Sequence, residues 1–213
     1  MRAIGLTGNV ASGKTTVADR WRKAGVRVVD ADAIGHAVIA EDADVREELI
    51  REFGGGILDY DEEIDRGRLG EKAFQTPEKT KRLNDIVHPP LLERLDEELE
   101  AAADAGEPMI VVDAALVFEF HLHEVLDEVV LVTAPREIRA DRLRRERGLA
   151  DETIDAIMAA QLSDTDKIDE SDYVIVNDGS IEDLYARADA VLDSIREELD
   201  SNVGAADPEH EEE

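Results

Sequence analysis

The sequence predicts an α/β fold of three layers, in which a five-stranded parallel sheet lies between helices. The first observation is a set of short apolar runs, rich in β-branched residues and typical of buried parallel strands, at residues 3–7, 26–30, 109–113, 129–133 and 173–177. The second is the helical spacing of apolar residues in most of the segments between them. The third is a glycine-rich segment, residues 8–15, which separates the first strand from the first helix.

This glycine-rich segment fits the pattern G-x-x-x-x-G-K-[ST] at every fixed position, which is that of a P-loop. Gly8 and Gly13 allow a tight turn that directs consecutive N–H groups and the positive end of the helix toward nucleotide phosphates. We expect Lys14 to bridge the β- and γ-phosphates and the Thr15 hydroxyl to bind Mg²⁺. A glycine-rich turn without a chemical role is the alternative, and the flanking strand and helix argue against it. The expected nucleotide-binding residues are Gly8, Asn9, Val10, Ala11, Ser12, Gly13, Lys14, Thr15 and Thr16.

The second strand ends in the sequence Asp30-Ala31-Asp32. Ligands of open α/β sheets bind beyond the carboxyl ends of the strands, so both carboxylates should face the same crevice as the P-loop. Asp32 is a candidate for the group that accepts a proton from an attacking hydroxyl or orients it. The alternative is that Asp32 only caps a helix beginning near Ala33, and the spacing alone leaves both open.

Residues 43–106 are almost entirely helical in pattern and favour a substrate-binding lobe inserted between the second and third strands. The expected helices are 45–53, 66–74, 77–87 and 89–105. Arg66 and His88 could face an acceptor in this lobe. The alternatives are a surface salt bridge for Arg66 and a helix-end position before two prolines for His88.

The third strand ends in Asp113, which is the pattern of a Walker B carboxylate that holds Mg²⁺ directly or through water. His121 and His123 follow soon afterwards. We do not expect them to bind a metal, because an i, i+2 spacing without a third ligand usually lies on the surface.

After the fourth strand comes a helix that begins near Pro135 and contains many arginines. Together with a helix at 151–167, it is expected to form a lid that closes over ATP and brings guanidinium groups to the transferred phosphoryl. The alternative is pairing with neighbouring acids such as Asp141 and Glu146. A closing helix is expected at 180–199, followed by an acidic, disordered tail at 200–213. The arginines are Arg136, Arg139, Arg142, Arg144, Arg145 and Arg147.

The composition excludes several functional classes. The 213 residues contain no cysteine, so disulfides, thiolate metal sites and a cysteine nucleophile are excluded. A net charge of −29 repels nucleic acid and anionic membranes, and no apolar run reaches bilayer length. We expect a cytoplasmic protein, either a monomer or a weak homo-oligomer. The acidic excess favours adaptation to a high-salt cytoplasm, the alternative being an ordinary acidic protein.

Several blocks of the sequence together resemble the dephospho-coenzyme A kinase family, in register from about residue 1 to residue 199. The resemblance implies a kinase that transfers the γ-phosphoryl of ATP to the ribose 3′-hydroxyl of dephospho-coenzyme A, which is the last step of coenzyme A biosynthesis. It further implies a P-loop core (1–31, 107–134 and 168–199), a helical acceptor-binding lobe (32–106) and a lid (135–167). The blocks are 5–8, 29–36, 53–54, 65–66, 88–89, 113–119, Gln161, Lys167 and 172–179.

The resemblance also implies roles for individual residues. Asp32 becomes the expected catalytic base, and residues 11–16 are expected to surround the ATP phosphates. Besides these, the P-loop makes Lys14 and the arginine-rich lid makes Arg142 expected catalytic residues, and Arg145 and Arg147 of the lid are expected to contact ATP. Ala115, Val117, Ile157 and the run Arg145-Glu146-Arg147 depart from the usual pattern of the family. The residues expected at the acceptor are Asp30, Asp32, His36, Arg66, His88 and Asp113.

Two other functions remain as alternatives. Another P-loop small-molecule or nucleotide kinase would share the P-loop and the lid but would need a different acceptor lobe. A nucleotide-dependent switch of the GTPase type would need an Asn-Lys-x-Asp guanine reader. None of the asparagines is followed by lysine, which favours a kinase; they are Asn9, Asn84, Asn177 and Asn202.

Overall fold

The computed structural model describes residues 1–205, and the chain divides into two compact units. The first, here called the sheet unit, comprises Met1–Val28 and the chain from Gly106 onward. The second, here called the helical unit, is Val29–Ala105. Within residues 1–205, no helix is both long enough and apolar enough to cross a membrane.

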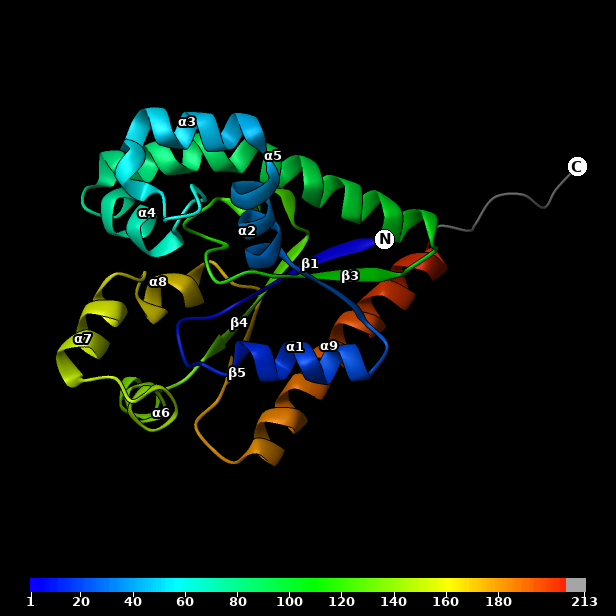
Figure 1. Ribbon diagram of the computed structural model, residues 1–213. Helices are drawn as coiled ribbons and strands as arrows, with labels where there is room; N and C mark the ends of the chain where they lie inside the picture. The colour runs from blue at the N-terminus through cyan, green and yellow to red at the C-terminus, as the bar shows by residue number, and fades with distance from the viewer. Residues whose placement is uncertain (206–213) are drawn as a thin grey trace, which may run out of the picture. The chain divides into compact units, whose positions relative to one another are not determined.

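Five strands form the sheet that the sequence predicts (Figure 1). Their spatial order is β2-β3-β1-β4-β5, and β1 pairs in parallel with both β3 and β4, as β4 does with β5. Leu6 near the end of β1 lies opposite Asp113 of β3, so the P-loop begins beside that carboxylate. The strands are β1 (Arg2–Thr7), β2 (Arg27–Asp30), β3 (Met109–Asp113), β4 (Glu128–Thr133) and β5 (Tyr173–Val176).

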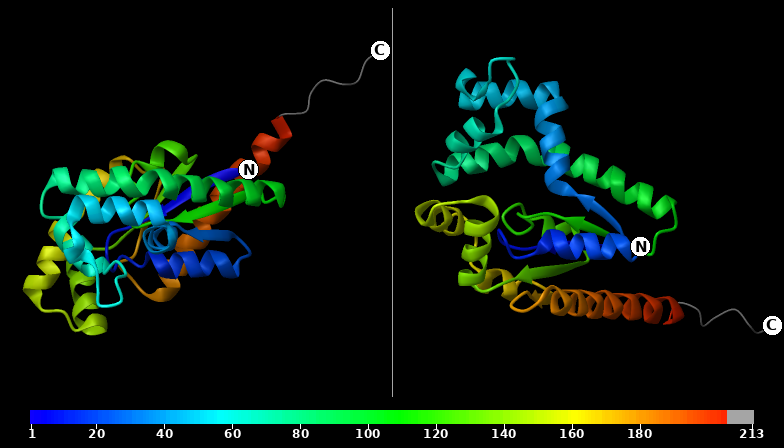
Figure 2. Two further views of the ribbon diagram at one scale, coloured as in Figure 1. Left: turned by 45° about the horizontal axis from the view of Figure 1, so that its top comes forward. Right: turned by 60° about the horizontal axis from the view of Figure 1, so that its bottom comes forward.

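Helices α1 (Lys14–Lys23) and α9 (Ile181–Ala205) pack side by side and cover the hydrophobic core of the sheet unit (Figure 2). Trp21 of α1 is fully buried, and its indole N–H donates to the carbonyl of Ala188 at 3.0 Å. This bond satisfies the polar atom of a large side chain that is otherwise apolar. Helix α1 begins directly after the P-loop, so its packing holds the P-loop firmly against the sheet.

The helical unit has a hydrophobic core of its own, in which Val38, Leu49 and Phe53 pack together. The four helices are α2 (Ala31–Glu41), α3 (Ala43–Phe53), α4 (Arg66–Ala73) and α5 (Pro77–Asp104). A 3₁₀ turn, Gly55–Ile57, follows α3. Since the core uses side chains from this unit alone, its helices hold one another in place without the sheet.

The prediction of two helices at 77–87 and 89–105 is wrong, because a single helix, α5, spans both. Pro89 and Pro90 lie inside it. Neither proline can donate a hydrogen bond to the preceding turn, and this local cost predicted a break. Leu83 before the prolines and Leu95 after them are both buried, and packing on both sides outweighs that cost.

The helices that were predicted to form a lid also differ from their expected bounds. Helix α6 (Arg136–Arg147) begins where expected, but the helix expected at 151–167 is two helices, α7 (Asp151–Ala159) and α8 (Asp164–Asp169). Ser163 caps α8 by accepting a hydrogen bond from the N–H of Asp166 at 3.1 Å, and this cap starts a new helix.

The end of the chain differs as well. Helix α9 continues to Ala205, so the predicted disordered tail at 200–213 is wrong for residues 200–205. The rest of that predicted tail, residues 206–213, lies outside the described residues.

Candidate active site

The P-loop connects β1 to α1 through a turn that requires glycine at two positions. A Cβ at Gly8 would lie 2.4 Å from the carbonyl oxygen of Val132, which no side chain can tolerate. Gly13 has φ 103, and a Cβ there would lie 2.3 Å from the amide nitrogen of Asn177. Gly13 is also the N-cap of α1, so the first N–H groups of this helix have no acceptor within it. They provide donors for an anion at the positive end of the helix.

Side chains from two other elements hold the P-loop by its carbonyl groups. The guanidinium of Arg142 on α6 donates to the carbonyl oxygens of Ala11 at 2.9 Å and Ser12 at 3.3 Å. The buried amide of Asn177, directly after β5, donates to the same Ser12 carbonyl at 2.7 Å. Because the carbonyls are bound from outside, the loop is fixed before any ligand arrives.

Lys14 and Asp113, both predicted to act at the nucleotide, lie together. The Nζ of Lys14 is 2.5 Å from Oδ1 of Asp113, and both side chains are largely buried. Arg22 adds a weaker contact, with Nη2 4.0 Å from Oδ2 of Asp113. The Walker B interpretation of Asp113 rested on a short apolar strand ending in Asp, and the structure places this carboxylate beside the P-loop lysine.

A hollow of about 360 Å³ lies beside the P-loop within the sheet unit. The P-loop and the first turn of α1 contribute Ala11, Gly13, Lys14, Thr15 and Thr16, and α6 contributes Arg142, Glu146 and Arg147. The remaining wall comes from the chain after β5, which the sequence analysis gave no role: Asn177, Gly179, Ile181 and Leu184. The available signal was positional, since this segment follows the carboxyl end of a parallel strand. The hollow has the size and the mixed apolar and cationic lining of a small-ligand site.

The arginines of α6 divide into different roles. Four of them form ion pairs with acids: Arg136 with Asp155, Arg139 with Asp164, Arg144 with Asp151, and Arg145 with Asp141. Contact with Asp151 raises the pKa of Arg144 above its usual value. The alternative considered for these arginines was pairing with neighbouring acids, and Arg145 does pair in this way. Arg142 instead contacts the P-loop, and Arg147 lines the hollow.

The segment between α7 and α8 is bonded to the first half of the P-loop. The side-chain oxygen of Gln161 accepts from the N–H of Val10 at 3.0 Å, and the amide of Asn9 donates to Asp164 at 2.9 Å. Arg139 donates to the other oxygen of that Asp164 carboxylate at 2.7 Å. These bonds join the segment predicted to be a lid to the P-loop, and no sequence spacing indicated them.

The remaining predicted site residues belong to the helical unit. The side chain of Asp30 caps α2 by accepting from the N–H of Ala33 at 2.8 Å. Asp32 lies in the first turn of α2 and is half-buried, so the alternative that it caps a helix starting near Ala33 is wrong. His36 is exposed one turn later, and the i, i+4 spacing places it on the same face of α2 as Asp32.

Arg66 and His88 lie on the two other helices expected at the acceptor. Arg66 is the exposed first residue of α4, where the neighbouring ion pair is between Arg68 and Asp65. His88 is half-buried inside α5, so its alternative position at a helix end is wrong. Helix α5 packs against both α2 and α4, so the unit's core holds together the elements that carry these side chains.

Comparisons with known proteins identify the family. The model of the dephospho-CoA kinase family matches residues 2–183. A dephospho-CoA kinase from Anaeromyxobacter dehalogenans is 39% identical over 92% of this chain and 93% of its own length. A crystal structure from Thermus thermophilus has a TM-score of 0.78 and 34% identity, covering 91% of this chain and 97% of that one. The dephospho-CoA kinase structure from Campylobacter jejuni has a TM-score of 0.67 and 26% identity, covering 91% and 96% respectively. The chain therefore belongs to the dephospho-CoA kinase family.

Proposed function

We propose that this protein transfers the γ-phosphoryl group of ATP to the ribose 3′-hydroxyl of dephospho-CoA and so completes coenzyme A biosynthesis. The observation that carries the proposal is a pre-formed P-loop in a chain of this family. Its Lys14 pairs with Asp113, and a ligand-sized hollow lies beside it. A P-loop alone would suit many kinases, and the family match over residues 2–183 selects the acceptor.

The triphosphate of ATP would lie on the N–H groups of the P-loop and of the first turn of α1. The adenosine would occupy the hollow between α6 and the segment after β5, where Arg147 and Ile181 line the wall. Lys14 would contact the β- and γ-phosphates and leave Asp113 to face the metal. The ATP contact expected of Arg145 stays a prediction, and its ion pair with Asp141 argues against that contact.

The residues expected to hold Mg²⁺ are Thr15 and Asp113. Their hydroxyl and carboxylate oxygens are the hard ligands that Mg²⁺ prefers, and Asp113 lies directly beside the P-loop lysine. When bound, Mg²⁺ would neutralise charge on the β- and γ-phosphate oxygens. The chain's own part is to hold Thr15 in the wall of the hollow and the Asp113 carboxylate beside Lys14.

Proton removal from the acceptor is assigned to Asp32. Its half-buried carboxylate at the start of α2 would accept the proton of the 3′-hydroxyl as that oxygen attacks the γ-phosphorus. The acceptor would be bound by the other predicted residues of the helical unit, namely Asp30, His36, Arg66 and His88. The catalytic role predicted for Arg142 stays a prediction, and its bonds to Ala11 and Ser12 support a role in positioning the loop.

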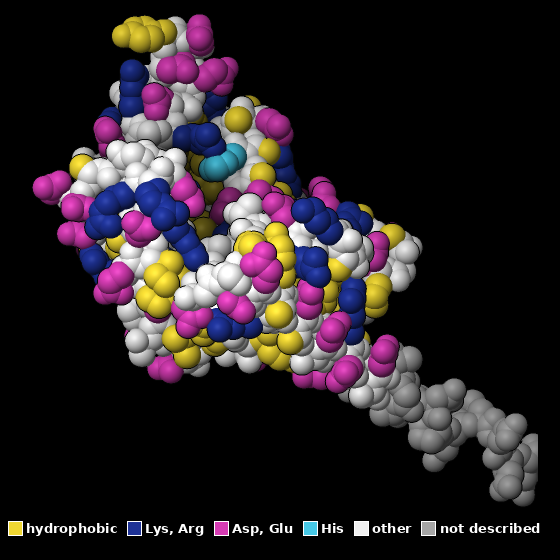
Figure 3. Space-filling view, turned by 90° about the horizontal axis from the view of Figure 1, so that it is seen from below, with side chains coloured by type: hydrophobic (Ala, Val, Ile, Leu, Met, Phe, Trp, Pro, Cys, Tyr) yellow, Lys and Arg dark blue, Asp and Glu magenta, His cyan; other side chains and the backbone are white. Residues whose placement is uncertain are grey.

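The acidic surface suits a cytoplasm with high salt. Asp and Glu side chains are scattered over the face seen in Figure 3, with Lys and Arg between them. At a net charge of −29, self-repulsion is relieved when salt near 1 M shortens the Debye length to about 3 Å. The protein would act there as a monomer or a weak homo-oligomer.

One assay tests the activity and the salt dependence together. ADP release from ATP and Mg²⁺ is measured with and without dephospho-CoA, from low potassium chloride to about 1 M. The proposal expects ADP release that requires dephospho-CoA and yields CoA by mass spectrometry. Release that is independent of dephospho-CoA, or that requires a different hydroxyl compound, would contradict the assigned acceptor. Full folding and activity at low salt would contradict the salt adaptation alone.

A further inference from the structure

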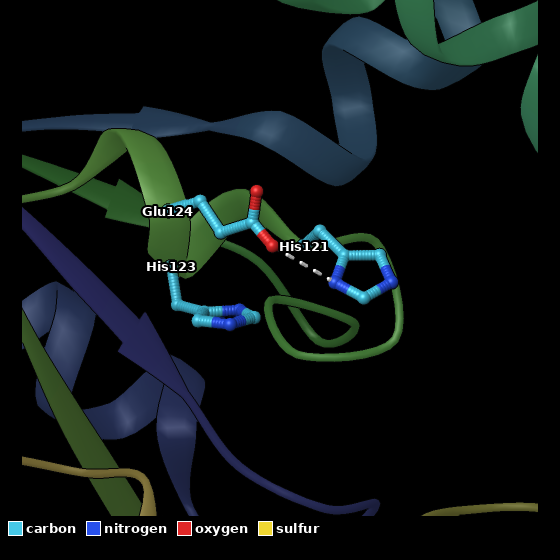
Figure 4. Close-up of side chains that lie close together, drawn as sticks. All are labelled: His121, His123 and Glu124. Atoms are coloured by element: carbon cyan, nitrogen blue, oxygen red, sulfur yellow. Dashed lines mark ion pairs between the residues drawn. The ribbon is translucent and has the colours of Figure 1, made fainter.

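The loop between β3 and β4 brings two histidines and a glutamate together at a turn outside the nucleotide site. The loop is fixed by backbone bonds, among them the N–H of Leu122 to the carbonyl of Val117 at 2.8 Å, and the side chain of Leu122 is buried. His121 has φ 54, a left-handed conformation that is uncommon outside glycine. This turn presents His121, His123 and Glu124 close together (Figure 4).

The three side chains lie close enough together to share one metal ion. One potential ligand atom from each lies within 4.8 Å of the others. Glu124 is directed at His121, with Oε1 3.3 Å from Nδ1, and the two imidazole centroids are 5.8 Å apart (Figure 4). Ligands of tetrahedral zinc lie about 3.4 Å apart, given metal–nitrogen distances of about 2.0–2.1 Å. Small rotations of the two exposed side chains, His121 and Glu124, would bring the ligand atoms to this spacing.

A second observation independently points to a ligand. The Nδ1 atom of His123 is buried and has no hydrogen-bond partner among the described residues. A buried polar atom without a partner is costly, and one explanation is a missing ion. The ring of His123 also packs beside Phe118, with centroids 5.4 Å apart, which restricts its orientation.

The surroundings favour a cation. The cluster lies on a hollow of about 490 Å³ whose wall also includes Asp166, Asp169 and Glu170. Lys167 reaches the same hollow, but its ammonium is 2.9 Å from Glu119, so that its charge is offset. The carboxylates give the hollow a negative field that attracts divalent ions and could supply a further ligand.

We propose that His121, His123 and Glu124 form a binding site for a divalent transition-metal ion of the zinc class, separate from the Mg²⁺ expected at Thr15 and Asp113. The sequence analysis set these histidines aside for lack of a third ligand, and Glu124 is that ligand. Two imidazoles and one carboxylate suit Zn²⁺ and Co²⁺ and disfavour Mg²⁺, which takes oxygen ligands. The site joins the loop after β3 to the hollow formed with α8, and it does not depend on the proposed kinase activity.

Equilibrium dialysis of the tag-free full-length protein against Zn²⁺ tests the site. Nucleotide is left out, and molar potassium chloride with excess Mg²⁺ suppresses binding to the acidic surface. We expect one Zn²⁺ per chain under these conditions, and Co²⁺ should give the visible absorption of a site with imidazole ligands. No retained Zn²⁺, or Zn²⁺ fully displaced by Mg²⁺, would overturn the proposal.

Variants assign the bound metal to the cluster. His121→Ala and His123→Ala should each weaken Zn²⁺ binding at least tenfold, because even outer-shell partners contribute about 10- to 100-fold. Glu124→Gln should weaken it similarly, while Glu48→Gln, which removes the same charge from exposed α3, should leave it unchanged. Circular dichroism checks folding, and exposed His121 provides the safer variant if His123→Ala unfolds. Unchanged Zn²⁺ affinity in folded His121→Ala would place the metal elsewhere and refute the site.

Discussion

The sheet unit and the helical unit hold their candidate functional residues in different ways. In the sheet unit, Arg142, Asn177 and Gln161 fix the P-loop through its backbone groups. In the helical unit, the acceptor candidates lie at the end of β2 and on α2, α4 and α5, and His36 and Arg66 are exposed. The comparison indicates that the phosphate site is rigid before nucleotide binds, whereas the acceptor residues can be altered without disturbing the P-loop.

The largest expected effect comes from Lys14→Ala in the sheet unit. This variant removes the ammonium group expected at the phosphates, and turnover should fall by about 10³-fold or more, as when a cationic side chain that stabilises phosphoryl transfer is lost. Steady-state ADP release measures the loss, and the melting temperature checks that the chain stays folded.

Lys23→Ala is the matched control, since Lys23 is an exposed residue at the end of the same helix. Its turnover should be close to that of the wild type. Substantial turnover in Lys14→Ala would show that catalysis at the phosphate site does not require the Lys14 ammonium group.

Asp32→Asn tests the helical unit and should lower turnover by about 10²- to 10⁴-fold, the usual contribution of a general base. The KM for ATP should stay unchanged, because the P-loop and its bonds belong to the other unit. Asp44→Asn is the matched control, as Asp44 occupies the first turn of α3 as Asp32 does that of α2. Equal effects of the two substitutions would mean that Asp32 only interacts favourably with the positive end of its helix, and would remove its assigned role as the base.

Arg142→Lys asks whether rigidity of the P-loop matters for nucleotide binding. Lysine cannot reproduce the planar guanidinium that reaches the Ala11 and Ser12 carbonyls, so the loop should loosen. We expect the KM for ATP to rise about tenfold, the equivalent of one hydrogen bond of about 1.4 kcal/mol.

Arg145→Lys provides the comparison within the same helix. Arg145 pairs with Asp141 one turn away and is exposed, so this variant should bind ATP almost normally. A larger effect of Arg145→Lys than of Arg142→Lys would reverse the roles that the geometry supports.

Sequence patterns over a few residues correctly predicted those elements whose conformation depends on interactions between residues close together in the chain. The P-loop and the strand ending at Asp113 were predicted because glycine placement, apolar runs and a terminal Asp are short-range signals. Helix α5 was mispredicted because the local cost of Pro89 and Pro90 is visible in the sequence, whereas the burial on both sides of them is not.

The long-range contacts of the candidate site could not be predicted from the sequence. Asn177 meets Ser12 across 165 positions of the chain, and Gln161 meets Val10 across 151. Such contacts arise because β1, β4 and β5 run parallel, so that the chain leaves all three strands at the same end of the sheet. The family resemblance indicated that Asp32 and its neighbours are site residues. It did not indicate which arginine would bind the carbonyl groups of the P-loop.

The smallest expected effect is a pH dependence located in the sheet unit. Tyr173 of β5 donates a hydrogen bond to Glu198 of α9 at 2.6 Å, and this contact together with burial raises the pKa of Tyr173 to about 12. An unfolded tyrosine ionises near pH 10, so the stabilisation is complete below about pH 10 and is lost as the pH rises toward 12. The melting temperature of the wild type should therefore fall more steeply between about pH 10 and pH 12 than that of Tyr173→Phe. Tyr60→Phe is the matched control in the helical unit, because Tyr60 is 98% exposed and its loss should leave the slope unchanged. The same slope in wild type and Tyr173→Phe would mean that the contact between β5 and α9 does not contribute to alkaline stability.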